Sequence, residues 1–308
     1  MWELYDALTA SVEPGHRLLD LAVGAEWTAV LSEDGGLGLA PTIREAFRRF
    51  DSSVKAEKGM DLSELAAAAR AWDYYDAALG LAAVNAVCNR AERLPAGAVH
   101  RPGGRRSLSA FLNYCKENLG GKHSLLIDPM YLRENLNNVP GIFDITRRET
   151  TYRDFPSCAY LELVPACDQL IMSGTPLVDK YAPLILQLAG SEPAAPPDTS
   201  GTLHPAAAVP AGSNDNPHPA AAAPAESNGN LYPAAALPAE PAGVSRAVSG
   251  KTRLWGMDVP MAPVLKEFNV QEITCFLADD PEKILWAVKR GGSRDDILKL
   301  GHFATVKL

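Results

Sequence analysis

The turn Ser173-Gly174-Thr175-Pro176 is the stretch of this sequence best suited to bind a ligand. It follows an apolar run that predicts a strand and opens a helical pattern, with Ser or Thr available as N-cap and Pro at the first helical position. A helix N-terminus at the carboxyl end of a parallel strand presents free backbone N–H groups, which suit a phosphate or carboxylate. The spacing therefore predicts an anion site, and ordinary helix capping explains it equally well.

A second strand-to-loop turn runs from Trp255 to Pro260. In a doubly wound sheet, Gly256 and Asp258 in this turn would flank the same crevice as the first turn. Asp258 is then a candidate hydrogen-bond acceptor or metal ligand, although a solvated turn aspartate fits the pattern as well.

The motifs of the common enzyme classes are missing. After the strand predicted over 123–127, where a dinucleotide-binding fold shows GxGxxG, the sequence reads IDPMYLREN with no glycine. NAD or FAD is therefore not expected as a cofactor. The sequence also contains no Walker lysine loop, HExxH, GxSxG or H-x-E with a Cys pair, which removes the standard hydrolase and NTPase readings and leaves the reaction, if any, unassigned.

Metal ligands are not grouped in a characteristic way. Cys158 with Cys167, the pair Asp279-Asp280, and His204 with His218 are the closest approximations, and none has the spacing of a preformed site. The five cysteines are scattered without CxxC spacing, as expected of reduced thiols in a cytosol. The sequence leaves a divalent metal ion as a candidate cofactor.

The composition and the net charge of the chain argue against some classes of binding partner. An apolar fraction of 47% and a charged fraction of 21% are those of a globular protein, and the net charge of −8 argues against nucleic-acid or anionic-membrane binding. The N-terminus predicts neither a signal peptide nor a membrane span, so a cytoplasmic location is expected. Homo-oligomerisation stays open.

The elements that must position these turns predict an α/β protein. A helix over 1–10, strands over 17–23, 26–31 and 37–40, and helices over 62–72 and 74–89 describe a small antiparallel sheet covered by helices. A helix over 107–118 then precedes a βα series, with strands over 123–127, 142–145, 169–172, 253–255 and 273–276 and helices over 177–189, 261–268 and 281–289. Alternating strands and helices predict a mostly parallel sheet. We expect two domains, 1–104 and 105–308.

The second domain is interrupted at 191–250. A 14-residue repeat begins HPAAAVPAGSNDNP at His204 and returns at His218, and the segment is rich in Ala and Pro. Such a tract buries too little apolar surface to offset its ordering entropy, so we expect a disordered surface insertion.

Four ordered fragments give the sequence a family resemblance. They are EWTA with GLGLA near residues 26–40, GLAAVNA at 80–86, PACDQLIMSGTPLVDK at 165–180 and GMDVP at 256–260. Together they resemble the largely uncharacterised family named Putative heavy-metal chelation, which pairs an enolase-N-terminal-like domain with a Rossmann-like domain. The resemblance implies a ligand pocket between the two domains. The positions that match the family are Trp27, Thr28, Gly38, Asn85, Gly174, Thr175 and Gly256.

Where the family usually has a threonine-rich turn followed by Asn, this chain has Ser173, Pro176 and Asp179. The leading hypothesis is a protein that binds a small anionic metabolite, or a metal or chelator precursor, in the cleft. Ser173, Thr175 and the backbone of Gly174 would hold the anion, and Asp179 or Asp258 would bind metal or move a proton. The alternative is a non-catalytic metal-binding or scaffold protein whose Ala/Pro-rich insertion reaches a partner.

Overall fold

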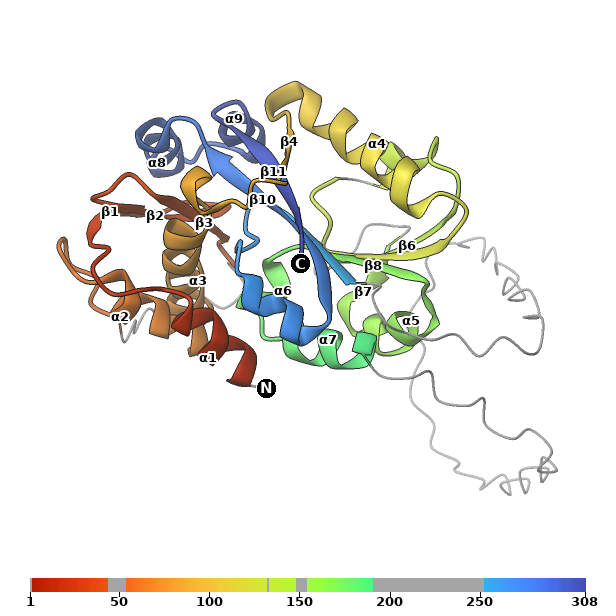
Figure 1. Ribbon diagram of the computed structural model, residues 1–308, viewed down its shortest axis with the longest axis horizontal. Coiled ribbons are helices and arrows are strands. Elements are labelled where there is room, and N and C mark those ends of the chain that lie inside the picture. Colours follow the sequence, from red (N-terminus) through yellow and green to blue (C-terminus); the bar gives the residue numbers. More distant parts are fainter. Residues whose placement is uncertain (1, 44–53, 132, 148–153, 191–251) are drawn as a thin grey trace, which may run out of the picture. The chain divides into compact units, whose positions relative to one another are not determined.

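The computed structural model describes residues 2–43, 54–131, 133–147, 154–190 and 252–308 (Figure 1). The insertion predicted at 191–250 lies outside the described residues. The chain folds as an α/β protein with two sheets, one of three strands and one of eight.

The N-terminal part is a three-stranded antiparallel sheet with helices packed against it, as predicted. Its elements are α1 (Trp2–Ala10), β1 (Leu18–Val23), β2 (Trp27–Ser32), β3 (Leu37–Pro41), α2 (Leu62–Ala66), the short 3₁₀ helix η2 (Ala67–Arg70) and α3 (Tyr74–Cys88).

Helix α3 is central to this part because it is buried on nearly all sides. Asp73 caps its N-terminus by accepting hydrogen bonds from the N–H groups of Tyr75 and Asp76. Gly38 lets β3 approach the helix closely, since a Cβ there would lie 1.9 Å from the carbonyl oxygen of Ala82.

The large sheet has the order β4-β11-β10-β9-β8-β5-β6-β7. The neighbours from β7 to β10 are parallel, and β10–β11 and β11–β4 are antiparallel. The sheet is therefore mixed and mostly parallel. Its strands are β4 (Val99–Arg101), β5 (His123–Ile127), β6 (Ile142–Arg147), β7 (Phe155–Pro156), β8 (Gln169–Met172), β9 (Thr252–Trp255), β10 (Val270–Ala278) and β11 (Gly301–Lys307).

Helices connect these strands. They are α4 (Ser107–Leu119), α5 (Tyr160–Ala166), α6 (Thr175–Val178), α7 (Ala182–Gly190), α8 (Pro281–Lys289) and α9 (Arg294–Leu298), with a 3₁₀ helix, η7 (Pro263–Phe268), after β9. The single helix predicted over 177–189 was wrong, because Lys180 has a φ of 72° and breaks it into α6 and α7.

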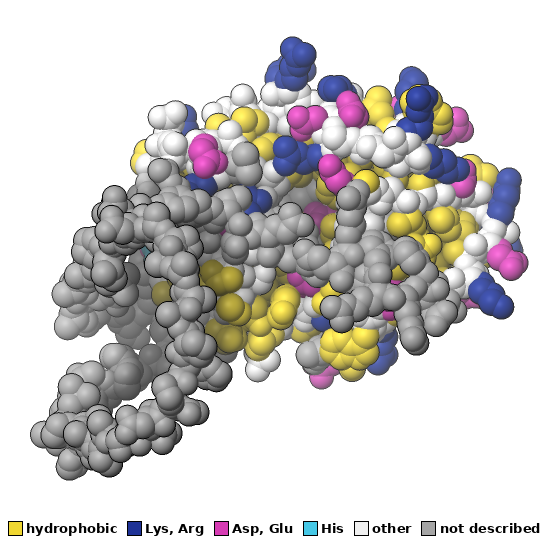
Figure 2. Space-filling model, turned by 180° about the vertical axis from the view of Figure 1, so that it is seen from behind, with side chains coloured by type: hydrophobic (Ala, Val, Ile, Leu, Met, Phe, Trp, Pro, Cys, Tyr) yellow, Lys and Arg dark blue, Asp and Glu magenta, His cyan; other side chains and the backbone are white. Residues whose placement is uncertain are grey.

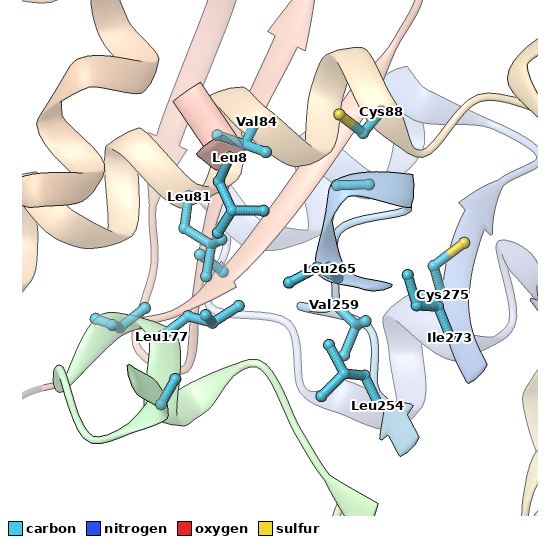
Figure 3. Close-up of a cluster of buried hydrophobic side chains, with 14 of the residues drawn as sticks. Leu8, Leu81, Val84, Cys88, Leu177, Leu254, Val259, Leu265, Ile273 and Cys275 are labelled. Carbon is cyan, nitrogen blue, oxygen red and sulfur yellow. The ribbon is translucent and has the colours of Figure 1, made fainter. Parts of the chain in front are cut away.

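One hydrophobic cluster joins the N-terminal helices to the large sheet. Figure 3 shows Leu8 of α1 and Leu81, Val84 and Cys88 of α3 on one side of this cluster. Side chains that follow or belong to β8, β9 and β10 complete it: Leu177, Leu254, Val259, Leu265, Ile273 and Cys275. This shared core fixes the loops after β8 and β9 against α3.

On the face seen in Figure 2, basic and acidic side chains are interspersed, with hydrophobic groups between them. Among the described residues, no helix has the length and apolar character needed to cross a membrane.

Candidate functional site

The order of the large sheet reverses at β5. The chain passes from β5 to β6 on one side and then returns to place β8 on the other side of β5. The N–H of Ser173 still reaches the carbonyl oxygen of Ile127 at 3.1 Å, so β5 and β8 end side by side. In open α/β sheets, the crevice outside the carboxyl ends of strands at such a point is the usual ligand site.

A cavity of about 480 Å³ lies at this point. It is bounded by residues that follow β5, β6, β8 and β9, by the β2–β3 sheet and by the start of α9. The lining residues are Glu26, Trp27, Pro41, Asp128, Pro129, Met130, Arg147, Ser173, Thr175, Gly256, Asp258, Ser293, Arg294 and Asp295. Five of the residues singled out from sequence are among them: Trp27, Ser173, Thr175, Gly256 and Asp258.

Asp258 is the most buried acid of this cavity, with an exposed fraction of 3%. Burial raises the pKa of its carboxyl group to about 6, and the nearby Asp128 carboxylate acts in the same direction. Hydrogen bonds from the N–H of Gly174 and the hydroxyl of Thr175 oppose this rise. Asp258 is therefore held as a buried carboxylate that exchanges its proton near neutral pH.

Two glycines make room for the Asp258 side chain. A Cβ on Gly256 would lie 2.2 Å from Oδ1 of Asp258, and one on Gly174 would lie 2.7 Å from its Cγ and 2.2 Å from its carbonyl oxygen. The two glycines singled out from sequence therefore leave the space that the Asp258 side chain occupies.

The N–H groups of the first turn are already engaged. Gly174 donates to the Asp258 carboxylate, and the N–H of Thr175 lies 3.2 Å from Oγ of Ser173. Asp258 is thus the anion that this turn holds. A ligand that enters here meets the carboxylate first.

Asp128 is the second acid of the cavity, and it was not selected from sequence. It ends β5 with a φ of 45°, a left-handed conformation that is uncommon outside glycine, although less so for Asp. The loop after it is fixed by Arg147, which donates to the carbonyl oxygens of Pro129 (2.9 Å) and Tyr131 (2.6 Å) and pairs with Asp154. The sequence analysis used the lack of GxGxxG at this loop only to argue against a dinucleotide, and the structure places Asp128 in the lining of the cavity.

The outer wall of the cavity is polar and mixed in charge. Arg294, at the start of α9, donates from its side chain to the carbonyl oxygen of Met130, and its backbone N–H lies 3.3 Å from Oε2 of Glu26. Trp27 contributes an indole whose Nε1 is buried without a hydrogen-bond partner in the described part of the chain. α9 was not predicted, which is why Arg294 was not found from sequence.

Three other residues singled out from sequence do not line the cavity and instead stabilise the elements around it. Nδ2 of Asn85 donates to the carbonyl oxygens of Leu39 (2.7 Å) and Asp258 (3.0 Å), which ties α3 to the loop after β9. Thr28 is buried with its hydroxyl 3.0 Å from that of Thr42. Gly38, as described above, permits close packing of β3 on α3.

Asp179 lies elsewhere. It follows α6, its Oδ1 lies 3.2 Å from the N–H of Tyr181, and its charge raises the pKa of Tyr5 in addition to the effect of burial. It is not among the residues that line the cavity. Of the two aspartates that the sequence offered as a metal ligand or proton carrier, only Asp258 lines this cavity.

The donor set does not match a metal ion held by the protein alone. No group of three or more His, Cys, Asp or Glu side chains converges on one point within the described ranges. Four of the five cysteines are buried, and Cys158 is exposed. Asp128 and Asp258 offer the cavity two inner carboxylates and no nitrogen or sulfur ligand.

Comparison with known proteins agrees with the resemblance seen in the sequence. Residues 5–88 match the family model DUF4213, described as Putative heavy-metal chelation. The matched stretch runs from α1 to the end of α3. A search of curated proteins found no match.

Two solved structures share the fold over the whole chain. One is a DUF364-family protein of unknown function from Desulfitobacterium hafniense DCB-2, with 20% identity, a TM-score of 0.70 and coverage of 100% of this chain and 99% of that one. The other, also of unknown function and of the DUF364 family, is from Pyrococcus horikoshii, with 14% identity, a TM-score of 0.65 and coverage of 99% and 98%. At these identities the likeness concerns the fold.

Proposed function

We propose that the protein binds a small metal-chelating molecule, or the precursor of one, that carries a cationic group such as an amine. The observation that carries this proposal is the pair of carboxylates, Asp128 and Asp258, which face one cavity closely enough for Asp128 to raise the pKa of Asp258. Two carboxylates that face the same cavity repel each other, and a bound cation relieves this repulsion.

The rest of the lining supports a ligand with groups of both signs. Four lining residues are acidic and two are arginines, and Arg147 is held by Asp154 and by backbone carbonyls. Arg294 stands on the outer wall, where its guanidinium donates to the carbonyl oxygen of Met130 and lies 3.4 Å from Oδ1 of Asp295. A guanidinium has five N–H donors, so it can also bind the carboxylate of a ligand whose amine faces inward. An amine next to a carboxylate is the donor pattern of small chelators, which agrees with the family description. We therefore place the cationic end of the ligand at Asp258, which keeps the chelator precursor of the sequence-based hypothesis and replaces the anion that it placed at the first turn.

We infer a two-part organisation for this function, with residues 1–104 as an enolase-N-terminal-like part and 105–308 as a Rossmann-like part. The separate three-stranded antiparallel sheet supports this division, and β4 (Val99–Arg101) is the one element before residue 104 among those described that pairs with the large sheet. A cytoplasmic location belongs to the same proposal and rests on the unpaired cysteines.

Native mass spectrometry with elemental analysis tests the proposal, on protein purified without a tag or added chelator. We expect an organic adduct, with or without metal, on the wild type. The adduct is lost in Asp258→Asn and retained in Asp179→Asn, because only Asp258 lines the cavity. Equal loss of the adduct in both variants, with unchanged thermal unfolding, would contradict the placement of the ligand at Asp258 and favour a role for Asp179 in binding.

A further inference from the structure

A row of three polar side chains crosses the antiparallel end of the large sheet. Nδ1 of His100 on β4 lies 3.1 Å from Nε2 of His302 on β11, and Nδ1 of His302 lies 2.7 Å from Oδ1 of Asp279, which follows β10. None of the three lines the cavity described above. The proposed ligand therefore leaves this row unexplained.

The strand register places the two imidazoles together. His100 is paired with Ala304, two residues from His302, so both side chains leave the same face of the β4–β11 pair. Their ring centroids are 5.2 Å apart and the planes are tilted by 40°. With the nitrogens at 3.1 Å, the rings meet through their nitrogen edges and not through their faces.

Asp279 fixes which nitrogen of His302 is available. A carboxylate oxygen at 2.7 Å accepts a hydrogen bond from Nδ1–H, which leaves the lone pair on Nε2 directed at His100. A histidine held in this way by a carboxylate is the arrangement found behind histidine ligands of metal ions, where the carboxylate raises the basicity of the ring.

The separation of the two nitrogens matches a shared metal ion. Two nitrogens, each about 2.05 Å from one ion, lie roughly 2.9 Å apart at a right angle and roughly 3.3 Å apart at the tetrahedral angle. The observed 3.1 Å lies between these values. To share one ion, His100 would move its proton from Nδ1 to Nε2, which leaves its charge unchanged, and the two solvent-accessible rings would turn so that both lone pairs converge on the ion.

We propose that His100 and His302 form a surface site for a divalent transition metal ion that favours imidazole, such as Zn²⁺, Ni²⁺ or Cu²⁺, with Asp279 as the positioning residue. His302 is 31% exposed at its side chain and His100 is exposed, so water can complete the coordination. Bound metal would tie the edge strand β4, which has three paired residues, to β11.

Titration of Zn²⁺ by calorimetry and of Cu²⁺ by electron paramagnetic resonance tests the site, on tag-free full-length protein stripped of metal. We expect one saturable site with hyperfine structure from two nitrogens. His100→Ala and His302→Ala lose it, and Asp279→Asn weakens the affinity ~10-fold, the loss typical when a partner of a ligating histidine is removed.

Matched variants separate this site from other histidines and from the cavity. His123 pairs with Asp144 at 2.6 Å, and no other histidine of the described ranges contacts it, so His123→Ala keeps the site. The double variant His204→Ala, His218→Ala should keep it as well. Asp258→Asn also keeps it, which makes the result independent of the proposed function. Equal affinity in wild type and His302→Ala, or no two-nitrogen signal in folded wild type, would overturn the proposal.

Discussion

At the scale of single residues, Asp258 determines what the cavity can do. Its carboxylate takes the hydrogen bond of the Gly174 N–H, and its backbone carbonyl accepts from Asn85. The protein thus fills its own anion site with a buried acid whose pKa is about 6. Burial of an ionised group costs stability, and such a cost is commonly retained where a group serves binding.

Asp258→Asn is expected to stabilise the protein at pH 7.5. The folded-state pKa lies above the unfolded value of about 3.9, so between these values the folded state binds more protons than the unfolded one, and the free energy of unfolding falls as pH rises. Removing the charge should add on the order of 2 kcal/mol at pH 7.5 and close to nothing at pH 4. Urea unfolding at both pH values measures this, and a gain independent of pH would contradict it.

Gly174→Ala is expected to destabilise the fold and weaken ligand binding together. The new Cβ would lie 2.2 Å from the carbonyl oxygen of Asp258, so the loop after β9 must shift. Such overpacking costs roughly 1–3 kcal/mol in urea unfolding. Gly97→Ala is the control, because a Cβ there meets no atom within 4 Å, and comparable losses in the two variants would argue against this steric reason.

At the scale of elements, α3 connects the N-terminal part to the site. Asn85 and Asn89 lie one turn apart and both bond the loop that follows β9: Nδ2 of Asn89 donates to the carbonyl oxygen of Val259 (2.9 Å), and its Oδ1 accepts from the N–H of Met261 (2.7 Å). The position of Asp258 thus depends on a helix far from it in sequence.

Asn89→Ala should lower the free energy of unfolding by about 2 kcal/mol, because it leaves two buried backbone groups without partners. We also expect weaker ligand binding, since the loop that carries Asp258 loses its anchor. Asn113→Ala, at an exposed position of α4, should change stability by less than about 0.5 kcal/mol. Chemical denaturation and a ligand titration on both variants check the two effects, and full ligand affinity in Asn89→Ala would show that the loop needs no such anchor.

The elements also show what the sequence could predict. The strands β1, β2, β3, β5, β8 and β9 and the helices α1, α3 and α8 follow from period and capping, and the two glycine turns were correctly expected at one crevice. The 3₁₀ form of η7, the break at Lys180 and the short helix α9 depend on tertiary contacts that a local pattern does not contain. Arg294 was missed because α9 was not predicted. Asp128 follows a correctly predicted strand and was missed because the local sequence does not show that it shares a cavity with Asp258.

At the scale of the whole molecule, the described residues have a core that does not depend on the insertion. Contacts group residues 1–193 and 248–308 into one unit, and the cluster around Leu81 and Leu254 spans both sides of the insertion in sequence. The fold of the two DUF364-family structures covers the chain at 20% and 14% identity, which shows that the architecture persists through extensive sequence change.

Replacing residues 194–247 by a Gly/Ser linker of about 12 residues should therefore leave the fold and the cavity intact. A shorter connection of this kind lowers the entropy cost of loop closure by about 1 kcal/mol, so we expect equal or slightly higher stability. Thermal unfolding and the adduct seen by native mass spectrometry provide the two readouts, with Asp258→Asn in the shortened chain as the negative control. Loss of the adduct from a shortened chain that unfolds like the wild type would instead assign the Ala/Pro-rich segment a part in ligand binding, because the buried core and the cavity lining would be unchanged.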